Sequence, residues 1–252
     1  MDKPNDIDEL RRRFLVRILA SGAFAVTGNL VSMRPAGAES FSKTPGPLPA
    51  GRSIYELRGD VLVNGSAASL ETFIGTGDKV QTGENSFIIF VVGKDAFILR
   101  SNSVLEIGAD KESGLSEEIK RITVNTLRVV TGKLLSVFGK QRHTIQTPTA
   151  VIGIRGTGVY VESVPDESYV CTCYGTTNIT SANDPRISET IVSTHHSAPR
   201  YVLAESKRGN IIRPAPFKNH SDEELLLIET LVGRTTPFVV PGGLRNYQRR
   251  YF

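Results

Sequence analysis

The sequence predicts a mostly β protein, an antiparallel β sandwich or roll of short strands followed by one short C-terminal helix. Short runs of β-branched and aromatic residues recur from about residue 53 onward, at the roughly eight- to twelve-residue spacing of sandwiches and rolls. Gly-, Asn- and Asp-rich turns, such as Asn64-Gly65 and Gly93-Lys94-Asp95, separate the runs and suit tight hairpins. A helix signal occurs only near the end of the chain.

The predicted strands form two series, separated by a polar loop over 109–120. The first series consists of residues 61–63, 79–82, 87–92, 96–99 and 104–107. The second series consists of residues 122–130, 134–138, 143–146, 158–162 and 169–174. Each run is rich in Val, Ile, Leu, Phe or Tyr, as expected for strands with at least one buried face.

The predicted helix follows Ser221, which with Glu224 forms a capping box. Gly233 provides a C-terminal stop. One face of the helix is apolar and consists of Leu225, Ile228, Leu231 and Val232. We expect this face to pack on the β domain, with an irregular tail after it.

The first 38 residues have the features of an export signal. Arginines at 11–13 precede a mildly apolar run over 18–31, and small residues stand at Ala36 and Ala38. The arginines followed by Phe-Leu resemble a twin-arginine signal, although an ordinary export signal stays an alternative. The run is shorter than the ~20 apolar residues that a membrane span needs. We therefore expect a periplasmic protein, cleaved near Ala38, with no transmembrane segment in the mature chain.

The sequence divides into a signal over 1–38, a Pro/Gly/Ser-rich linker over 39–52, a β domain over 53–205 and a C-terminal extension over 206–252. Without the signal, 24 Lys and Arg face 22 Asp and Glu. The mature chain is therefore close to neutral. Basic residues are not interleaved with aromatic ones, so we do not expect a nucleic-acid partner.

The region from about Tyr55 to Thr180 resembles the periplasmic domain of the iron-dicitrate sensor regulator (FecR) family. Residues 77–83 are similar to the family's G-D-x-I-x-T element, and residues 147–158 are similar to its T-P-x-A-x-x-G-V-R-G-T run. The resemblance implies an extracytoplasmic β module used for binding or assembly. We interpret Arg155, inside the second motif, as a structural clamp that bonds carbonyls or an acid within the fold.

The sequence departs from the signalling members of that family. Those members carry a tryptophan-containing cytoplasmic segment that contacts a sigma factor, followed by a transmembrane helix. This sequence has no Trp and no such segment. We therefore do not expect the role of a sigma-factor regulator.

Two cysteines and two histidines form the residue set with the clearest binding chemistry. Cys171 and Cys173 lie two residues apart in a predicted strand, so their side chains point to the same face. A returning strand over about 187–192 would bring His195 and His196 beside them. Two thiolates with one or two imidazoles suit tetrahedral zinc, and also copper or iron. We therefore predict a metal site at Cys171, Cys173, His195 and His196.

Adjacent histidines in a regular strand point to opposite faces, so either both lie in a bend or only one binds the metal. In the second case, His220 is the candidate for the fourth ligand. Two other interpretations of Cys171 and Cys173 stay open. One is a disulfide, because exported proteins meet an oxidising compartment. The other is plain burial of two small apolar side chains.

No catalytic motif stands out in the sequence, so we predict a protein that is not an enzyme. The first function hypothesis is a binding protein that holds a metal ion or small ligand for envelope sensing or metal handling. The alternative is an interaction module that binds cell-wall glycan or an envelope protein.

Overall fold

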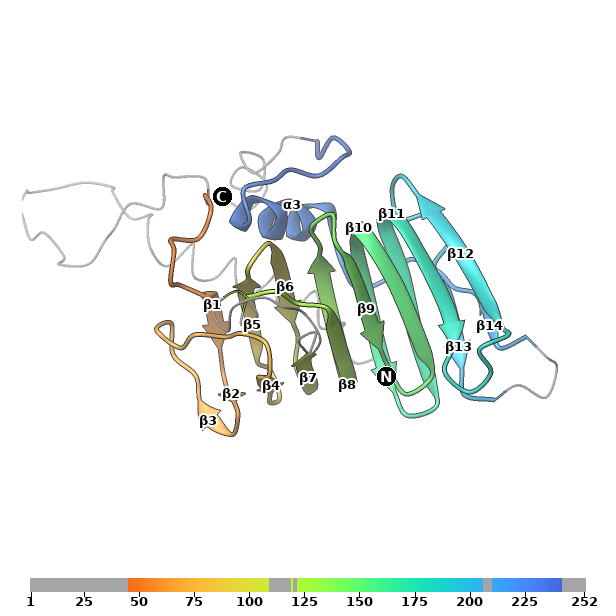
Figure 1. The fold of residues 1–252 in the computed structure, drawn as a ribbon, viewed down its shortest axis with the longest axis horizontal. Helices are drawn as coiled ribbons and strands as arrows, with labels where there is room; N and C mark the ends of the chain where they lie inside the picture. Colours follow the sequence, from red (N-terminus) through yellow and green to blue (C-terminus); the bar gives the residue numbers. More distant parts are fainter. Residues whose placement is uncertain (1–44, 109–118, 120–121, 206–209, 242–252) are drawn as a thin grey trace, which may run out of the picture.

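The computed structural model describes residues 45–108, 119, 122–205 and 210–241. The predicted signal, most of the polar loop over 109–120 and the end of the tail lie outside the described residues. Within them, fourteen strands form one sheet that is not closed, and helix α3 (Asp222–Leu231) follows (Figure 1). The mostly β prediction is confirmed. No helix among the described residues is long and apolar enough to span a membrane.

The sheet has a main path of ten strands and two branches. The main path runs β14-β13-β11-β10-β9-β8-β7-β4-β2-β3; strands β6, β5 and β1 branch from β8, and β12 branches from β11. The strands are β1 (Ile54–Arg58), β2 (Val61–Val63), β3 (Ser66–Ala67), β4 (Lys79–Thr82), β5 (Phe87–Val92), β6 (Asp95–Leu99), β7 (Ser103–Gly108), β8 (Thr126–Val137), β9 (Arg142–Gln146), β10 (Ala150–Val164), β11 (Glu167–Ser181), β12 (Ser188–Ser193), β13 (Arg200–Leu203) and β14 (Ile212–Pro214). Neighbours pair antiparallel except β8 and β9, which pair parallel.

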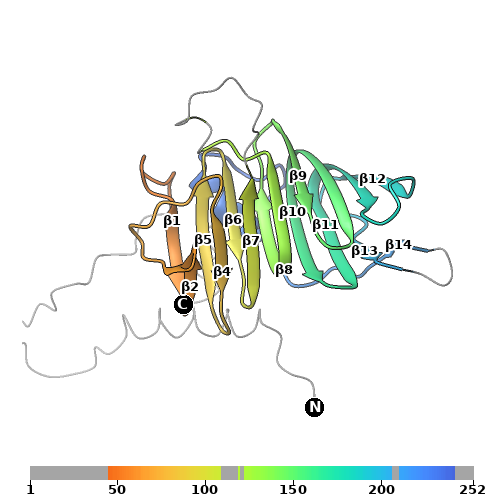
Figure 2. The ribbon, with the colours of Figure 1, turned by 60° about the horizontal axis from the view of Figure 1, so that its bottom comes forward.

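Three long strands change partners along their length and so divide the sheet into two layers. The first half of β8 pairs with β7 and its second half pairs with β6. Strand β10 pairs first with β9 and then with β8, and β11 pairs first with β13 and then with β12. Strands β7 and β6 both pair with β8, in different halves of that strand, and lie next to each other in the ribbon (Figures 1 and 2). Gly132, Gly156 and Gly175, all with positive φ, lie where the three strands change partners.

The main hydrophobic core lies between the two layers. It combines side chains such as Phe90 and Leu99 from one layer with Leu105 and Ile152 from the other. Alternate residues of the β5–β6 layer point the other way, and these form a second apolar cluster with α3. Along β8, successive side chains point to opposite faces: Leu134 belongs to the main core and Leu135 belongs to the second cluster. The structure is therefore a β sandwich with a helix on one outer face.

Helix α3 begins with the predicted capping box. The Ser221 hydroxyl accepts a hydrogen bond from the Glu224 backbone N–H, and the Glu224 carboxylate accepts one from the Ser221 N–H. The same carboxylate lies 2.7 Å from a guanidinium nitrogen of Arg100, a residue of the β6–β7 turn that is only 1% exposed. Leu225, Ile228 and Leu231 are buried against the sheet. The N-terminus of α3 is thus held by both apolar packing and an ion pair.

Several strand boundaries differ from the prediction; for example, the strand predicted over 169–174 is β11, which runs from Glu167 to Ser181. The runs 122–130 and 134–138 belong to one strand, β8, because Gly132 bends the strand at φ +97° without ending it. Strand β10 begins at Ala150, so most of the motif over 147–158 is itself strand. Strands β1, β3, β13 and β14 were not predicted as separate elements.

The interpretation of Arg155 as an internal clamp is wrong, because its side chain is exposed on β10. Its neighbours in the strand, Ile154 and Thr157, point inward and are buried. Among the described residues, the buried arginine is Arg100, which no motif identified in the sequence.

Candidate metal centre

Strand β11 places Cys171 and Cys173 on the outer face that α3 covers. Both side chains are fully buried, and both are free thiols. Strand β12 pairs with β11 in the predicted hairpin, with Gly175 opposite Ser193. The chain then bends, and the His196 backbone N–H donates to the Cys173 carbonyl oxygen at 2.8 Å. The returning strand predicted over 187–192 is therefore confirmed.

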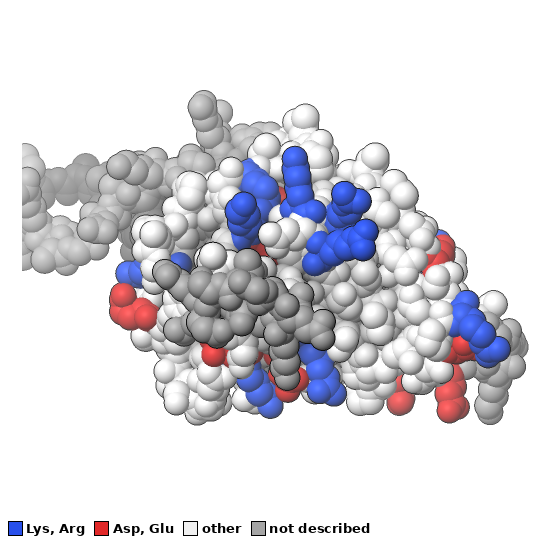
Figure 3. Space-filling view, viewed as in Figure 1, with Lys and Arg blue, Asp and Glu red and all other residues white. Residues whose placement is uncertain are grey.

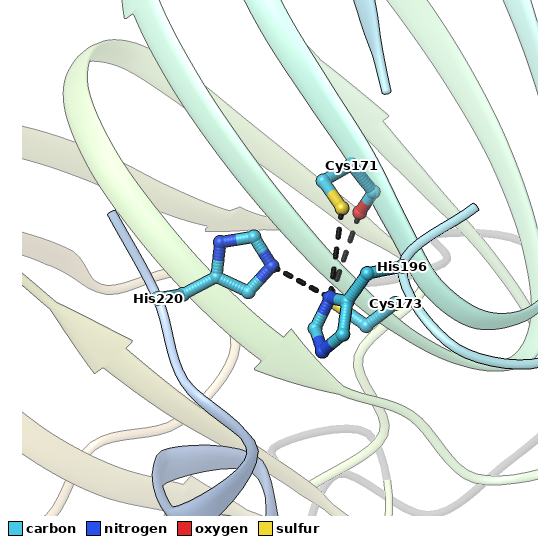
Figure 4. Close-up of side chains that lie close together, drawn as sticks. All are labelled: Cys171, Cys173, His196 and His220. Carbon is cyan, nitrogen blue, oxygen red and sulfur yellow. Dashed lines mark hydrogen bonds between the residues drawn. The ribbon is translucent and has the colours of Figure 1, made fainter. Parts of the chain in front are cut away.

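The bend resolves how two adjacent histidines are placed. His196 has a φ of +48°, so it does not continue the strand. Its Nδ1 lies 3.7 Å from Cys171 Sγ and 3.0 Å from His220 Nε2 (Figure 4). One ligand atom from each of Cys171, Cys173, His196 and His220 lies within 4.8 Å of the others. We call these four residues the sulfur–imidazole cluster.

His195 does not join the sulfur–imidazole cluster. Its Nε2 lies 2.9 and 3.0 Å from the two carboxylate oxygens of Asp222, and its side chain is 51% exposed. The structure thus brings together three of the four predicted ligands and adds His220. It matches the alternative in which one histidine of the pair faces the cysteines.

The hydrogen bonds of the two clustered histidines fix which ring nitrogens carry protons. His220 Nδ1 faces the Lys218 carbonyl oxygen at 2.8 Å, and His196 Nε2 faces the Asp222 carboxylate at 2.8 Å. Both oxygens only accept, so both nitrogens must donate. His196 Nδ1 and His220 Nε2 are then left with lone pairs that point at each other across 3.0 Å. A positive charge between them, a proton or a metal ion, is needed to offset their repulsion.

The two thiols differ in acidity. The pKa of Cys171 is lowered, first by a hydrogen bond with Cys173 and then, against the opposing effect of burial, by His196 and His220. The pKa of Cys173 is raised, mainly by burial and then by its neighbour Cys171. One thiolate is thus favoured in the cluster before any metal binds. A metal ion would have to displace the second proton.

The pKa of His196 is raised. Burial lowers this pKa, but hydrogen bonds to Cys171 and Asp222 and the negative charges of these two groups outweigh burial. Without a metal, a proton on the imidazole and a thiolate nearby therefore stabilise each other. A divalent cation would replace that proton and satisfy the same lone pairs.

Aromatic rings surround the cluster and lower the local dielectric. The Tyr160 ring stacks on His220 with centroids 4.5 Å apart. Phe217 lies 4.7 Å from the His196 ring and 4.6 Å from the His220 ring. The Phe238 ring contacts His195 from the C-terminal segment. Such a shell strengthens charge interactions inside the site.

The geometry is close to that of a tetrahedral site but more open. Zinc bonds of about 2.3 Å to sulfur and 2.0–2.1 Å to nitrogen place ligand atoms roughly 3.3–3.8 Å apart. The distances from His196 Nδ1 to Cys171 Sγ (3.7 Å) and to His220 Nε2 (3.0 Å) are near these values. The four ligand atoms as a set, however, lie up to 4.8 Å from one another. Binding of zinc would therefore require some of the ligand atoms to move closer together.

Sequence reasoning missed Asp222, which accepts from both His195 and His196. A signal was present, since Asp222 is an acid two residues after His220 at the start of the predicted helix. Acidic residues in the first turn of a helix are already explained by the helix dipole. The contacts of Asp222 with the two histidines were therefore not expected from the sequence. Phe217 carried no sequence signal at all.

Comparisons with known proteins give only a weak structural likeness. No family model and no curated protein matches the sequence. Two crystal structures of a protein from Parabacteroides distasonis ATCC 8503, provisionally named an anti-sigma factor, align with TM-scores of 0.43 and 0.42 at 8% identity. Each alignment covers 60% of this chain and 64% of that protein. Likeness at this level assigns no function, so the resemblance to the FecR family stays a prediction.

Proposed function

We propose that this chain is an exported, non-catalytic β-domain protein that holds one metal ion in the sulfur–imidazole cluster. Two sulfur and two imidazole ligands favour zinc, with copper or iron as the other candidates. The ion would serve envelope sensing or metal handling, as a FecR-like extracytoplasmic domain with an export signal suggests.

The observation that carries this proposal is the approach of His196 Nδ1 to His220 Nε2 at 3.0 Å and to Cys171 Sγ at 3.7 Å, with Cys173 also in the cluster. His196 and His220 each donate their other ring proton to an oxygen, which is how metal-binding histidines are oriented. The Asp222–His196 contact repeats the carboxylate–histidine arrangement found behind many zinc ligands.

The burial of the sulfurs supports a non-catalytic role. Cys171, His196 and Asp222 do lie in the order of a nucleophile, a base and an acid. However, Cys171 is fully buried, and a nucleophile must be reached by its substrate. A metal ligand, in contrast, is favoured by burial.

Metal content tests the proposal directly. The protein would be purified from the cytoplasm without a metal-affinity tag, and its metal measured by elemental analysis. We expect about one zinc per chain, and a thiolate charge-transfer band when zinc is replaced by cobalt. The Cys171→Ser and His220→Ala variants should lose both the metal and the band.

His195→Gln is the matched control, because His195 touches the same Asp222 but lies outside the cluster. It should keep the metal. Metal-free wild-type protein that also binds no added zinc or cobalt would overturn the proposal. Mass spectrometry of the unreduced protein would then show whether Cys171 and Cys173 form a disulfide instead.

A further inference from the structure

A group of basic side chains gathers around the β5–β6 turn, the β8–β9 turn and the middle of β10 (Figure 3). It consists of Lys94, Lys140, Arg142 and Arg155, all exposed, and we call it the basic patch. Arg142 and Arg155 are directly opposite each other in the β9–β10 pair. Gly156, next to Arg155, lies close to the Lys140 backbone, and Gly139 lies close to the Lys94 side chain.

The Arg142–Arg155 pairing is unfavourable for the fold alone. Residues directly opposite in an antiparallel pair have neighbouring side chains on one face, and like charges there destabilise the sheet. The next pair inward, His143 and Ile154, is buried, which fixes the two arginines on the outer face. A local conflict of this kind marks a position that serves something other than stability.

Within the described residues, none of the four basic side chains forms an ion pair. Other exposed arginines of the chain do: Arg186 pairs with Asp184 and Arg213 with Glu167. The carboxylate beside the patch, Asp95, is turned inward and buried. Among the described residues, no carboxylate therefore compensates the positive charges of the patch.

A bulge in β10 holds Arg155 in place. The β10–β11 register shifts between Arg155 and Gly158, and Gly156 takes a φ of +59° there. The Thr157 hydroxyl donates to the Arg155 carbonyl oxygen at 2.9 Å and accepts from the Thr176 N–H at 3.3 Å. Bulges can change the direction of a side chain and are over-represented at sheet edges and next to active sites.

From these observations we infer that the basic patch binds the phosphate groups of an anionic polymer. Two adjacent guanidinium groups provide planar donor forks that match phosphate oxygens. The four charges come from neighbouring strands and turns, with strands about 4.8 Å apart, so they can contact successive phosphates. The patch is an exposed sheet surface, so binding depends on several contacts along one chain. This inference does not depend on the metal site.

Long-chain inorganic polyphosphate is the probe, and its binding would be measured by fluorescence anisotropy at about 50 and 200 mM salt. We expect an Arg142→Gln, Arg155→Gln double variant to bind at least tenfold more weakly. An Arg186→Gln, Arg213→Gln double variant changes the net charge equally and should stay within twofold of wild type. An Arg142→Lys, Arg155→Lys variant keeps the charge and should bind several-fold more weakly, because it lacks the planar forks.

Melting temperatures should not fall in the glutamine or lysine variants of the patch, since both positions are exposed and repel each other. Equal loss of binding in the two glutamine double variants would overturn the inference, since net charge alone would then explain it. Polyglutamate of matched length binding as tightly as polyphosphate would also overturn it, in favour of an acidic peptide. Binding to vesicles of anionic lipid without binding to polyphosphate would also overturn the inference.

Discussion

The buried carboxyl group of Asp95 gives the sharpest prediction about stability. Asp95 is 4% exposed at the start of β6. Its Oδ1 accepts from the Gly139 N–H at 2.8 Å, and its Oδ2 lies 3.8 Å from His143 Nδ1. Burial raises the pKa of Asp95 from 3.8 to about 6, although the Gly139 hydrogen bond and Arg234 oppose the shift. Burial likewise lowers the pKa of His143, so this histidine is neutral near pH 7.

The sign of the effect follows from the direction of the shift. Because the pKa of Asp95 is raised on folding, the folded state holds this proton more tightly than the unfolded state. The stabilisation is complete below about pH 4 and is lost as the pH rises through about 6. A difference of about two pKa units corresponds to roughly 3 kcal/mol at neutral pH. Asp95→Asn removes the ionisation and retains an acceptor for Gly139.

We therefore expect Asp95→Asn to be more stable than wild type at pH 7.5, by up to about 3 kcal/mol, and equally stable at pH 4. The measurement is urea unfolding followed by far-UV circular dichroism, since the chain has no Trp. Comparing the variant with wild type at each pH cancels the titration of other groups. A variant that is less stable than wild type at pH 7.5 would refute the reasoning, because it would mean an ionised Asp95 paired with a protonated His143.

Three further predictions concern the metal centre, the ion pair at the start of helix α3 and a bend of the sheet. Asp222→Asn should weaken zinc binding by about 10- to 100-fold, through loss of the carboxylate behind His196; a competition titration with a chelator measures it, and an unchanged affinity contradicts it. Glu224→Gln keeps a capping-box residue but removes the charge facing buried Arg100, so urea unfolding should show a loss of about 3 kcal/mol. Gly132→Ala would place a Cβ 2.5 Å from the Ser103 Cα at a φ of +97°, and should cost about 3 kcal/mol. A cost below about 1 kcal/mol in either variant would show that the site relaxes freely.

Local patterns in the sequence predicted much of the fold. The strands Lys79–Thr82 and Phe87–Val92 have the predicted bounds, because turns with Gly and Asn bound them closely. The helix was found from its capping box. The bends of the long strands were not predicted, because a glycine that ends a strand and a glycine that bends it have the same local sequence pattern. At the bend of β8, Gly132 has a positive φ and a Cβ there would collide with Ser103 of the neighbouring strand, so the position requires glycine.

The candidate site was predictable where it depended on short-range order. The spacing of Cys171 and Cys173 fixed their shared face, and the Asn183-Asp184-Pro185 turn placed the returning strand. Which histidine faces the sulfurs depended on the positive φ of His196, which no local pattern indicated. The contribution of His220 depends on α3 packing onto the sheet, a contact between segments far apart in the sequence.

X-ray absorption at the zinc edge of the loaded protein tests the central claim most directly. The account predicts two sulfur neighbours at about 2.3 Å and two nitrogen neighbours at about 2.0–2.1 Å. Replacement of His220 by Ala should remove one of the nitrogens or release the ion. A coordination shell of nitrogen and oxygen alone would contradict the account, because it would place the metal away from Cys171 and Cys173.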